Sequence, residues 1–393
     1  MKFKRPNSID LYLRGLENLI QGFSRIPNRN KSVLINRLPF ISKIHNKLIH
    51  QIVWSIFLIG EPIISVLIET IMVIPYLIMV GVSKKKSISN YLCITDNPLL
   101  SKRIMCSDMH HKIKDWVYIS SAKLNNNDST KEIHNIYEYL QISDVILSYF
   151  ESIVATFLSL RISQFKYVMR NYTSFEYFMM YKFLRNIPTT TIICFCNQID
   201  KWALLFDDAP LRKILFQHGI DRPTSKWPNK LKKTDTVYVL SKEESTFLIN
   251  AIFERTPKNI NILNPTISLS PIVDNQKFSI LIVGFPGYLK FNIESKLIRK
   301  FAQSDIMVYF KPHPGKEDMT KYFALREEYP TNCEIILTQT FPRVNIVVSY
   351  LSTLAIEYQA HNIKVLTYED YSIEEIENII SQYYLKYKNA KLQ

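Results

Sequence analysis

The tetrapeptide Lys-Pro-His-Pro at 311–314 has the side chains expected of a phosphate site. It follows an apolar run that ends at Phe310, so it lies where a predicted strand ends. The two prolines restrict the backbone and hold His313 between them in an extended conformation. An imidazole can donate hydrogen bonds to phosphate oxygens while the ammonium of Lys311 supplies charge. We expect Lys311, His313 and Pro314 to bind an anion, and an ordinary proline-rich turn is the alternative.

A second polar segment, Ser349 to Thr353, follows the predicted strand Ile346 to Val348 and opens a helix. Hydroxyls and unpaired backbone N–H groups at a helix N-terminus bind anions without glycine. We expect Ser349, Ser352 and Thr353 to share one phosphate with the first segment, because both follow strands of the same unit. Glu357, one helical turn later, could accept hydrogen bonds from ribose hydroxyls. Ser352 as a simple helix cap and Glu357 as a solvated glutamate are the alternatives.

A candidate base lies in the first half of the chain. His218 follows the apolar run Leu211 to Phe216, and its ordinary pKa lets it accept a proton near neutrality. The upstream pair Asp207 and Asp208 is an alternative base if one pKa is raised. A histidine that merely completes a turn is the bland alternative. We expect His218 to face a cleft between the two halves of the chain, and three further polar residues to line that cleft: Asn197, Asp200 and Gln217.

Several sites are excluded by composition. The chain has 8 Gly in 393 residues, about 2% against a usual figure of about 7%. Neither GxGxxG nor GxxxxGK occurs, so a glycine-rich nucleotide loop is not expected. Asp-x-Asp and His-x-x-x-His spacings do not occur either. We therefore expect no metal and no cofactor, with protein cations and helix N-termini neutralising a leaving phosphate.

The elements that must position these residues alternate between strands and helices from about residue 87 onward. This alternation predicts an α/β protein with parallel, doubly wound sheets, in which ligands bind beyond the carboxyl ends of strands. A Pro/Ser/Asn-rich linker at 261–275 separates two units, which predicts domains at 87–265 and 276–393 after a helical segment at 1–86. The predicted strands are 91–95, 116–119, 190–195, 211–216, 236–240, 279–283, 306–310, 334–337, 346–348 and 364–367.

The first 86 residues are basic and then apolar. Residues 1–50 carry ten Lys or Arg, residues 52–82 are almost wholly apolar, and Lys84 to Lys86 follow. A leader of this length does not fit a secretory signal, and Glu69 would lie near the middle of a spanning helix. We expect two apolar helices that lie in or dip into a membrane leaflet, with cations that contact anionic lipid. A buried helical hairpin and a true span are the alternatives.

The remaining composition narrows the function classes. With 47% hydrophobic and 12% aromatic residues, disorder, collagen and coiled coil are excluded. Five cysteines without a CxxC pair are expected to be core residues in a reducing compartment. The net charge of +14 does not follow the pattern of a nucleic-acid-binding module, so no nucleic acid partner is expected.

These motifs together resemble the bacterial GT-B transferases with an HP motif, which build surface polymers: the sialyl- and polysialyltransferases and the CDP-glycerol glycerophosphotransferases. The resemblance covers about 120 C-terminal residues. It rests on Gly284-Phe285-Pro286-Gly287, the tetrapeptide at 311–314, the segment 349–353 and Glu357. Gln217-His218-Gly219, followed by a strand and Ser241, is similar to the His-Gly element of the glycerophosphotransferases, in which such a histidine is implicated in activating the acceptor hydroxyl.

The resemblance implies two Rossmann-like domains and an inverting, metal-independent glycosyltransferase. Gly284 would belong to the donor site. The donor would be a CMP-linked sugar of the sialic acid or Kdo type, and the acceptor a glycan or a lipid-linked glycan. The product would be capsule, O-antigen or lipooligosaccharide, made at the cytoplasmic face of the inner membrane. A CDP-glycerol-type glycerophosphotransferase is one alternative, and a sugar-nucleotide epimerase or a non-catalytic membrane-bound scaffold is another.

Overall fold

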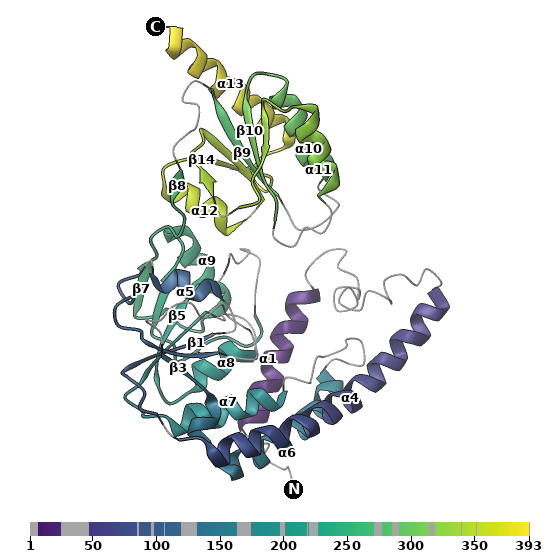
Figure 1. Cartoon of the computed structure of the whole chain (residues 1–393), viewed down its shortest axis with the longest axis vertical. Coiled ribbons are helices and arrows are strands. Elements are labelled where there is room, and N and C mark those ends of the chain that lie inside the picture. The colour runs from purple at the N-terminus through teal and green to yellow at the C-terminus, as the bar shows by residue number, and fades with distance from the viewer. Residues whose placement is uncertain are drawn as a thin grey trace. The chain divides into compact units, whose positions relative to one another are not determined.

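The structure of the chain is a computed structural model. It describes residues 7–24, 47–84, 86–95, 98–105, 107–118, 132–162, 174–196, 201–217, 219, 227–270, 277–284, 291–313, 319–338, 340–350 and 352–392. The chain divides into two compact units, Met1–Ile262 and Leu263–Gln393 (Figure 1). The division falls within the predicted linker, and each unit is described by itself below.

The first unit is built on a parallel sheet of seven strands in the order β3-β2-β1-β4-β5-β6-β7. The order reverses between β1 and β4, which makes the sheet doubly wound in the Rossmann sense. The central strands β1 and β4 are largely buried and are almost wholly apolar, as is typical of parallel strands covered on both faces. The strands are β1 (Tyr91–Thr95), β2 (Asp115–Tyr118), β3 (Glu132–His134), β4 (Ile192–Phe195), β5 (Arg212–Phe216), β6 (Thr236–Val239) and β7 (Asn259–Ile262).

Helices cover this sheet and extend it on one flank. They are α1 (Asn7–Ser24), α4 (Lys47–Val82), α5 (Pro98–Met105), α6 (Ile142–Ile162), α7 (Ser174–Asn186), α8 (Lys201–Asp208) and α9 (Lys242–Ile252), with a 3₁₀ turn at Ile136–Tyr139. Tyr12 and Leu16 of α1 belong to the main core of the unit, so the first helix is part of the globular unit. The predicted pair of apolar helices is instead the single helix α4, which contains both Pro62 and Pro75.

The second unit repeats the same design on a smaller scale. Its parallel sheet has the order β11-β10-β9-β13-β14, which matches the order of the first five strands of unit 1. The strands are β9 (Ser279–Val283), β10 (Met307–Lys311), β11 (Cys333–Ile335), β13 (Ile346–Ser349) and β14 (Lys364–Thr367). The helices are α10 (Phe291–Ala302), α11 (Thr320–Glu328), α12 (Thr353–Ala360) and α13 (Ile373–Leu392). A short parallel pair, β8 (Leu269–Ser270) and β12 (Phe341–Pro342), completes the unit.

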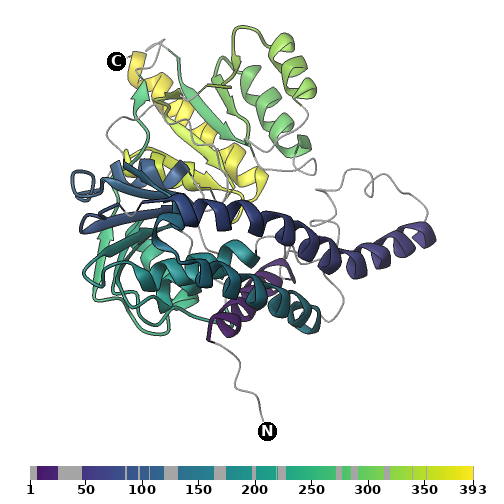
Figure 2. The same ribbon diagram turned by 60° about the horizontal axis from the view of Figure 1, so that its bottom comes forward.

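Alternate residues of the central strand β9 enter two different cores. Ile280 and Ile282 pack with residues of α10, α11 and α13, whereas Leu281 and Val283 pack with Tyr358 of α12. Helices therefore cover both faces of the sheet, as Figures 1 and 2 also show. The α/β fold class predicted from the sequence is confirmed for both units.

Candidate functional site

The carboxyl ends of β9 and β10 meet at Gly284. Its backbone N–H donates a 2.8 Å hydrogen bond to the carbonyl oxygen of Lys311. A Cβ at this position would lie 3.0 Å from Cζ of Phe310, 3.2 Å from Cα of Pro312 and 3.3 Å from the backbone nitrogen of His313. Only a residue without a side chain lets the end of β9 approach this loop so closely. Gly284 therefore fixes where Pro312 and His313 lie at the edge of the sheet.

The Lys311 side chain is held across the strand ends. Its Nζ donates to the carbonyl oxygen of Thr338 and lies 5.4 Å from the centroid of the Phe341 ring. Burial lowers the pKa of Lys311. The ammonium has three N–H donors, so this anchor leaves capacity for an anion. His313, two residues on, is exposed at the same strand end.

The serine-rich segment follows β13, on the other side of β9. Val348 pairs with Ile282 in register, so both segments border the carboxyl end of β9. This is the point at which the strand order reverses, where doubly wound sheets bind ligands. The two predicted phosphate-binding segments are therefore neighbours in the fold.

Ser352 and Ser349 have different positions in this segment. Ser352 is the N-cap of α12, and its hydroxyl accepts a 3.2 Å hydrogen bond from the backbone N–H of Ala355. Ser349 is fully buried, and its hydroxyl lies 2.8 Å from that of Ser352. Ser349 therefore positions Ser352. The predicted contact of Ser349 with a donor phosphate does not fit its full burial. Thr353, the first residue of α12, is half-buried.

Glu357 of α12 has a structural partner. Its Oε2 accepts a 2.9 Å hydrogen bond from the backbone N–H of Thr266, and its Oε1 accepts a 2.7 Å bond from the Thr266 hydroxyl. The carboxylate is buried and fastens the start of the second unit to α12. The expected contact with a ribose does not fit this environment, because both oxygens already accept hydrogen bonds inside the unit.

Aromatic side chains pack between β10 and α11. Phe310 stacks on Tyr322 of α11 with ring centroids 4.3 Å apart, and the Tyr322 hydroxyl donates to Glu294 of α10. Glu294 is fully buried. Burial, together with this hydrogen bond, raises the pKa of Tyr322. A buried Glu in an amphipathic helix has no distinguishing sequence pattern, so this support could not be predicted.

Gln217 ends β5 at the carboxyl edge of the first sheet. Its Oε1 accepts from the backbone N–H of Leu240 at 2.9 Å, and its Nε2 donates to the Gly219 carbonyl at 2.8 Å and to Glu244 at 2.9 Å. Gln217 was predicted to line a cleft, but this does not fit its full burial. It joins Gly219 to Leu240 and to Glu244 of α9. His218, Asn197, Asp200 and Pro314 lie outside the described residues.

Asp207 and Asp208 lie at the opposite edge of this sheet. They end α8, shortly before β5 begins at Arg212, so they belong to its amino edge. Asp207 is buried and accepts hydrogen bonds from the backbone N–H groups of residues 232, 233 and 234 at 2.7 to 2.9 Å. Asp208 accepts from Asn7, Arg185 and Lys233. Both carboxylates join chain segments, and the base role predicted for either does not fit this position.

Two cavities of about 280 Å³ are found in the first unit. One lies at the carboxyl ends of β2 and β3, between α4 and α7, and is lined by Met72, Tyr76, Tyr118, Asn135, Tyr137 and Glu176 among others. Burial raises the pKa of Tyr76 to about 12, with smaller contributions from Glu176 and Tyr137. The other is lined by the first residues of several strands and so lies at the amino edge. Only the first is at the edge where doubly wound sheets bind ligands.

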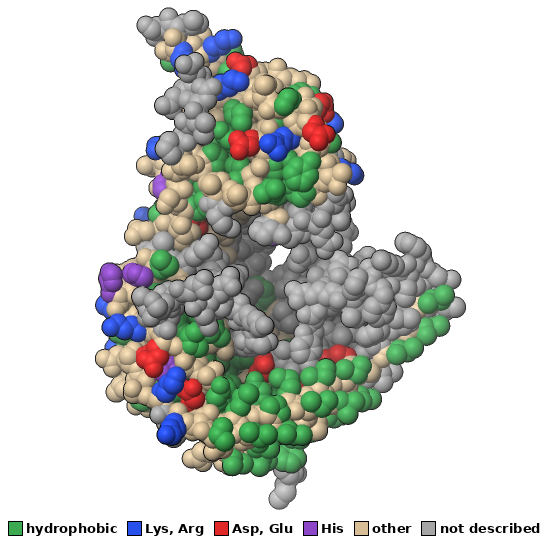
Figure 3. All heavy atoms as spheres, viewed as in Figure 1, with side chains coloured by type: hydrophobic (Ala, Val, Ile, Leu, Met, Phe, Trp, Pro, Cys, Tyr) green, Lys and Arg blue, Asp and Glu red, His purple; other side chains and the backbone are tan. Residues whose placement is uncertain are grey.

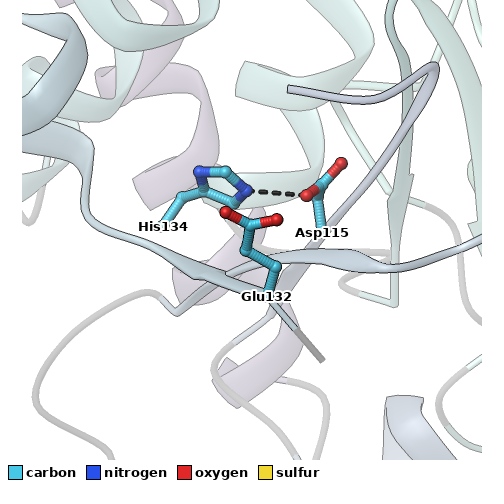
Figure 4. A group of neighbouring side chains, drawn as sticks. All are labelled: Asp115, Glu132 and His134. Atoms are coloured by element: carbon cyan, nitrogen blue, oxygen red, sulfur yellow. Dashed lines mark hydrogen bonds and ion pairs between the residues drawn. The ribbon is translucent and has the colours of Figure 1, made fainter. Parts of the chain in front are cut away.

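Asp115, Glu132 and His134 bring three potential metal-ligand atoms within 4.8 Å of one another (Figure 4). Both imidazole nitrogens are engaged, however: Nε2 lies 2.7 Å from Oδ1 of Asp115 and Nδ1 lies 2.7 Å from the Tyr139 hydroxyl. Burial alone would raise the pKa of Asp115, but hydrogen bonds from Ser89 and His134 outweigh it and lower the pKa. Asp115, His134 and Tyr139 therefore form a buried hydrogen-bond chain that joins β2, β3 and the following 3₁₀ turn, whereas Glu132 is exposed.

No protein-family model and no curated protein matches the chain. Among solved structures it is similar to MurG of Acinetobacter baumannii, with 10% identity over 76% of this chain and 91% of that chain and a TM-score of 0.39. It is also similar to the calicheamicin glycosyltransferase CalG4, with 9% identity, coverage of 75% and 84%, and a TM-score of 0.40. A third is the sucrose-phosphate synthase of Thermosynechococcus elongatus, with 12% identity, coverage of 71% and 81%, and a TM-score of 0.39.

Proposed function

We propose that the chain is a glycosyltransferase that takes a sugar from a nucleotide-linked donor and holds the donor phosphates in its second unit. One observation carries the proposal: the Lys311–His313 loop and the N-terminus of α12 flank Gly284 at the point where the strand order of a Rossmann-type sheet reverses. Such a point binds ligands in doubly wound folds, and a helix N-terminus favours anions.

We infer the following transfer. His218 takes the proton of an acceptor hydroxyl. The acceptor oxygen forms a bond to the anomeric carbon while the bond from that carbon to the phosphate oxygen breaks, with inversion. Lys311 and His313, with Ser352 and Thr353 at the start of α12, stabilise the negative charge that develops on the leaving phosphate. This requires no metal.

A CMP-linked sugar of the sialic acid or Kdo type is the donor that the sequence resemblance favours. The product would then be a bacterial capsule, O-antigen or lipooligosaccharide. CDP-glycerol is the second candidate donor, because Gln217-His218-Gly219 is similar to the element of the glycerophosphotransferases. Either donor would use the same phosphate-binding residues.

The acceptor would bind the first unit. The cavity between α4, α7 and the ends of β2 and β3 supports this, since tyrosines and a glutamate line it beside apolar side chains. Tyrosine hydroxyls and a carboxylate can recognise glycan hydroxyls. We further propose that the enzyme works at the cytoplasmic face of the inner membrane, where segment 1–86 contacts anionic lipid and brings the cavity near a lipid-linked acceptor.

Thermal unfolding with CMP, CDP, UDP and GDP tests the donor site. A ligand that binds only the folded state raises the free energy of unfolding, by about 2.7 kcal/mol at a hundredfold excess over Kd. The melting temperature rises as a result. We expect cytidine nucleotides to raise it and the others to do so less. No shift with any nucleotide would contradict the proposal. Turnover of a nucleotide sugar without any acceptor would favour the epimerase alternative.

A further inference from the structure

The outer sides of α4 and α6 form one apolar surface. The segments Gly60–Val82 and Ile142–Ser159 are each long and apolar enough to cross a membrane, with mean hydropathies of 2.4 and 1.4. Only 11% of the first segment and 33% of the second are buried. The two helices lie side by side, and their hydrophobic side chains form a green strip along the lower border of Figure 3.

The large exposed side chains of this strip are aliphatic or phenyl groups and the thioether of Met79, and Thr70 and Ser143 are the exposed hydroxyl residues among the described positions of the two segments. On α4 the large exposed side chains recur every three or four residues, which places them on one face of the helix. None of the charged residues in the two segments is among the exposed ones. The large exposed residues of the strip are Ile63, Ile64, Leu67, Ile68, Ile71, Ile74, Ile78, Met79 and Val82 of α4, with Ile142, Ile146, Leu147, Phe150, Val154 and Phe157 of α6.

The inner side of α4 is attached to the globular unit. Glu69 is fully buried, and its Oε1 accepts hydrogen bonds from the Ser174 hydroxyl at 2.6 Å and from the backbone N–H of Phe175 at 2.9 Å. It thus satisfies the N-terminus of α7. Met72 and Tyr76, on the same side of α4, pack against the core of the first unit.

The attachment of α4 to the globular unit distinguishes a helix that lies on a membrane from one that crosses it. A helix that crosses a bilayer meets lipid around its circumference unless other spanning helices cover it. Here the inner side carries a buried carboxylate and joins α7, whose side chains fill the core of the first unit. Crossing the bilayer would pull Glu69 away from Ser174 into hydrocarbon. The helix therefore fits a membrane only with its long axis in the plane of the surface.

The chemistry of the strip favours lipid over a second copy of the chain. Protein interfaces are enriched in Tyr, Trp and Arg, as well as Phe and Met, and their buried centre is depleted of charged residues. The large exposed residues of the strip include Phe and one Met but no Tyr, Trp or Arg, and the exposed Lys84 and Lys86 follow the end of α4. Lysines beside an apolar helix face attract anionic headgroups.

We propose that α4 and α6 together form a docking surface. This surface lies flat in the leaflet of an anionic bilayer that faces the protein, and it does not cross the bilayer. This inference deepens the membrane localisation proposed above, and it does not depend on the transfer reaction. It adds α6, which lies outside segment 1–86, to the membrane contact. Point substitutions on the strip test this contact better than a deletion of residues 1–86 would, because α1 belongs to the core of the unit.

Flotation of the full chain with vesicles of phosphatidylcholine and phosphatidylglycerol is the test. Leu67→Asp on α4 and Phe150→Asp on α6 each add a charge to the strip. Each should weaken binding by more than about tenfold. Ile262→Asp is the matched control, since all three side chains are 59% exposed and Ile262 ends the distant strand β7. Circular dichroism confirms that each variant folds.

Three results would overturn the proposal. Unchanged binding of Phe150→Asp would remove α6 from the contact. Dimerisation without vesicles that Leu67→Asp abolishes would identify a second copy as the occupant. Cysteines introduced at Gly60 and Lys84, which lie at or just beyond the two ends of the segment Gly60–Val82 and are not among the strip residues, should both react from outside with an impermeant maleimide, and labelling of only one would indicate a span. Nucleotide thermal shifts of the variants should equal those of the natural chain, which separates this test from the donor site.

Discussion

His313 is an exposed polar side chain that follows β10. Replacing it with alanine should therefore leave the melting temperature unchanged, because exposed substitutions usually alter stability by less than about 0.5 kcal/mol. Turnover should fall by about 10²- to 10³-fold, as expected when a group that stabilises developing charge is removed. His110→Ala, at an exposed position of the first unit, is the control and should keep normal turnover. Near-normal turnover of His313→Ala would remove the imidazole from the mechanism.

Asp207 leads to the opposite expectation. Asp207→Ala leaves three backbone N–H groups without their acceptor, which should lower the free energy of unfolding by about 2 to 3 kcal/mol. Activity per folded molecule should be retained, because the residue lies at the amino edge of the sheet. Urea unfolding and active-site titration measure the two quantities. A stable variant without activity would restore Asp207 as a candidate base.

Asp115 makes stability depend on pH. Hydrogen bonds outweigh burial and lower its pKa in the folded state, so the unfolded chain takes up a proton first as the pH falls. Its contribution to stability should be complete above about pH 4, the ordinary range of an aspartate, and lost as the pH falls through the lower folded pKa. In Asp115→Asn the free energy of unfolding should depend less on pH in this range. Urea unfolding at pH values from about 2 to 6, which bracket the titration of an ordinary aspartate, measures this dependence. An unchanged curve would assign the acid lability to other carboxylates.

At the scale of elements, Gly284 couples the end of β9 to the phosphate-binding loop. Gly284→Ala places a Cβ 3.2 Å from Cα of Pro312 and 3.3 Å from the backbone nitrogen of His313, so the loop must move. We expect a loss of about 1 to 3 kcal/mol from overpacking and a weaker nucleotide thermal shift. Gly60→Ala is the matched control, because nothing lies within 4 Å of its Cβ. A normal nucleotide shift for Gly284→Ala would show that the loop position does not matter for the donor.

Central strands that are buried on both faces are predicted well from the sequence. The ranges 91–95 and 279–283 coincide with β1 and β9, because continuous β-branched and apolar runs are typical of central parallel strands. The range 364–367 coincides with β14, an edge strand whose sequence Lys-Val-Leu-Thr still has an apolar centre. The edge strands β3 and β7 were not predicted, since their sequences Glu-Ile-His and Asn-Ile-Asn-Ile are half polar and resemble loops. Their strand state depends on pairing with a neighbour along the sheet.

For the candidate site too, features that depend on local sequence can be predicted, and features that depend on contacts distant in the chain cannot. Strand ends with polar residues are visible in the sequence, and this predicts the proximity of Lys311, His313 and Ser352 to β9. Apart from the contact of Gln217 with Gly219, the partners of Asp207, Gln217 and Glu357 lie 23 to 91 residues away in the chain, so only the fold reveals that these side chains are structural. The cavity beside α4 draws on five elements and has no sequence pattern.

At the scale of the whole molecule, each unit has its own hydrophobic core and its own Rossmann-ordered sheet. The second unit, Leu263–Gln393, has the size of an ordinary independent domain of about 100 to 150 residues. Expressed alone it should therefore unfold cooperatively, and it should show the same nucleotide preference as the full chain, because Gly284, the Lys311–His313 loop and Ser352 all belong to it. It should not float with vesicles, since α4 and α6 belong to the first unit. Circular dichroism, thermal shift and flotation check the three expectations. A cooperative fragment without a nucleotide shift would mean that the first unit supplies essential contacts to the donor, and His313→Ala in the full chain would then distinguish a shared donor site from none.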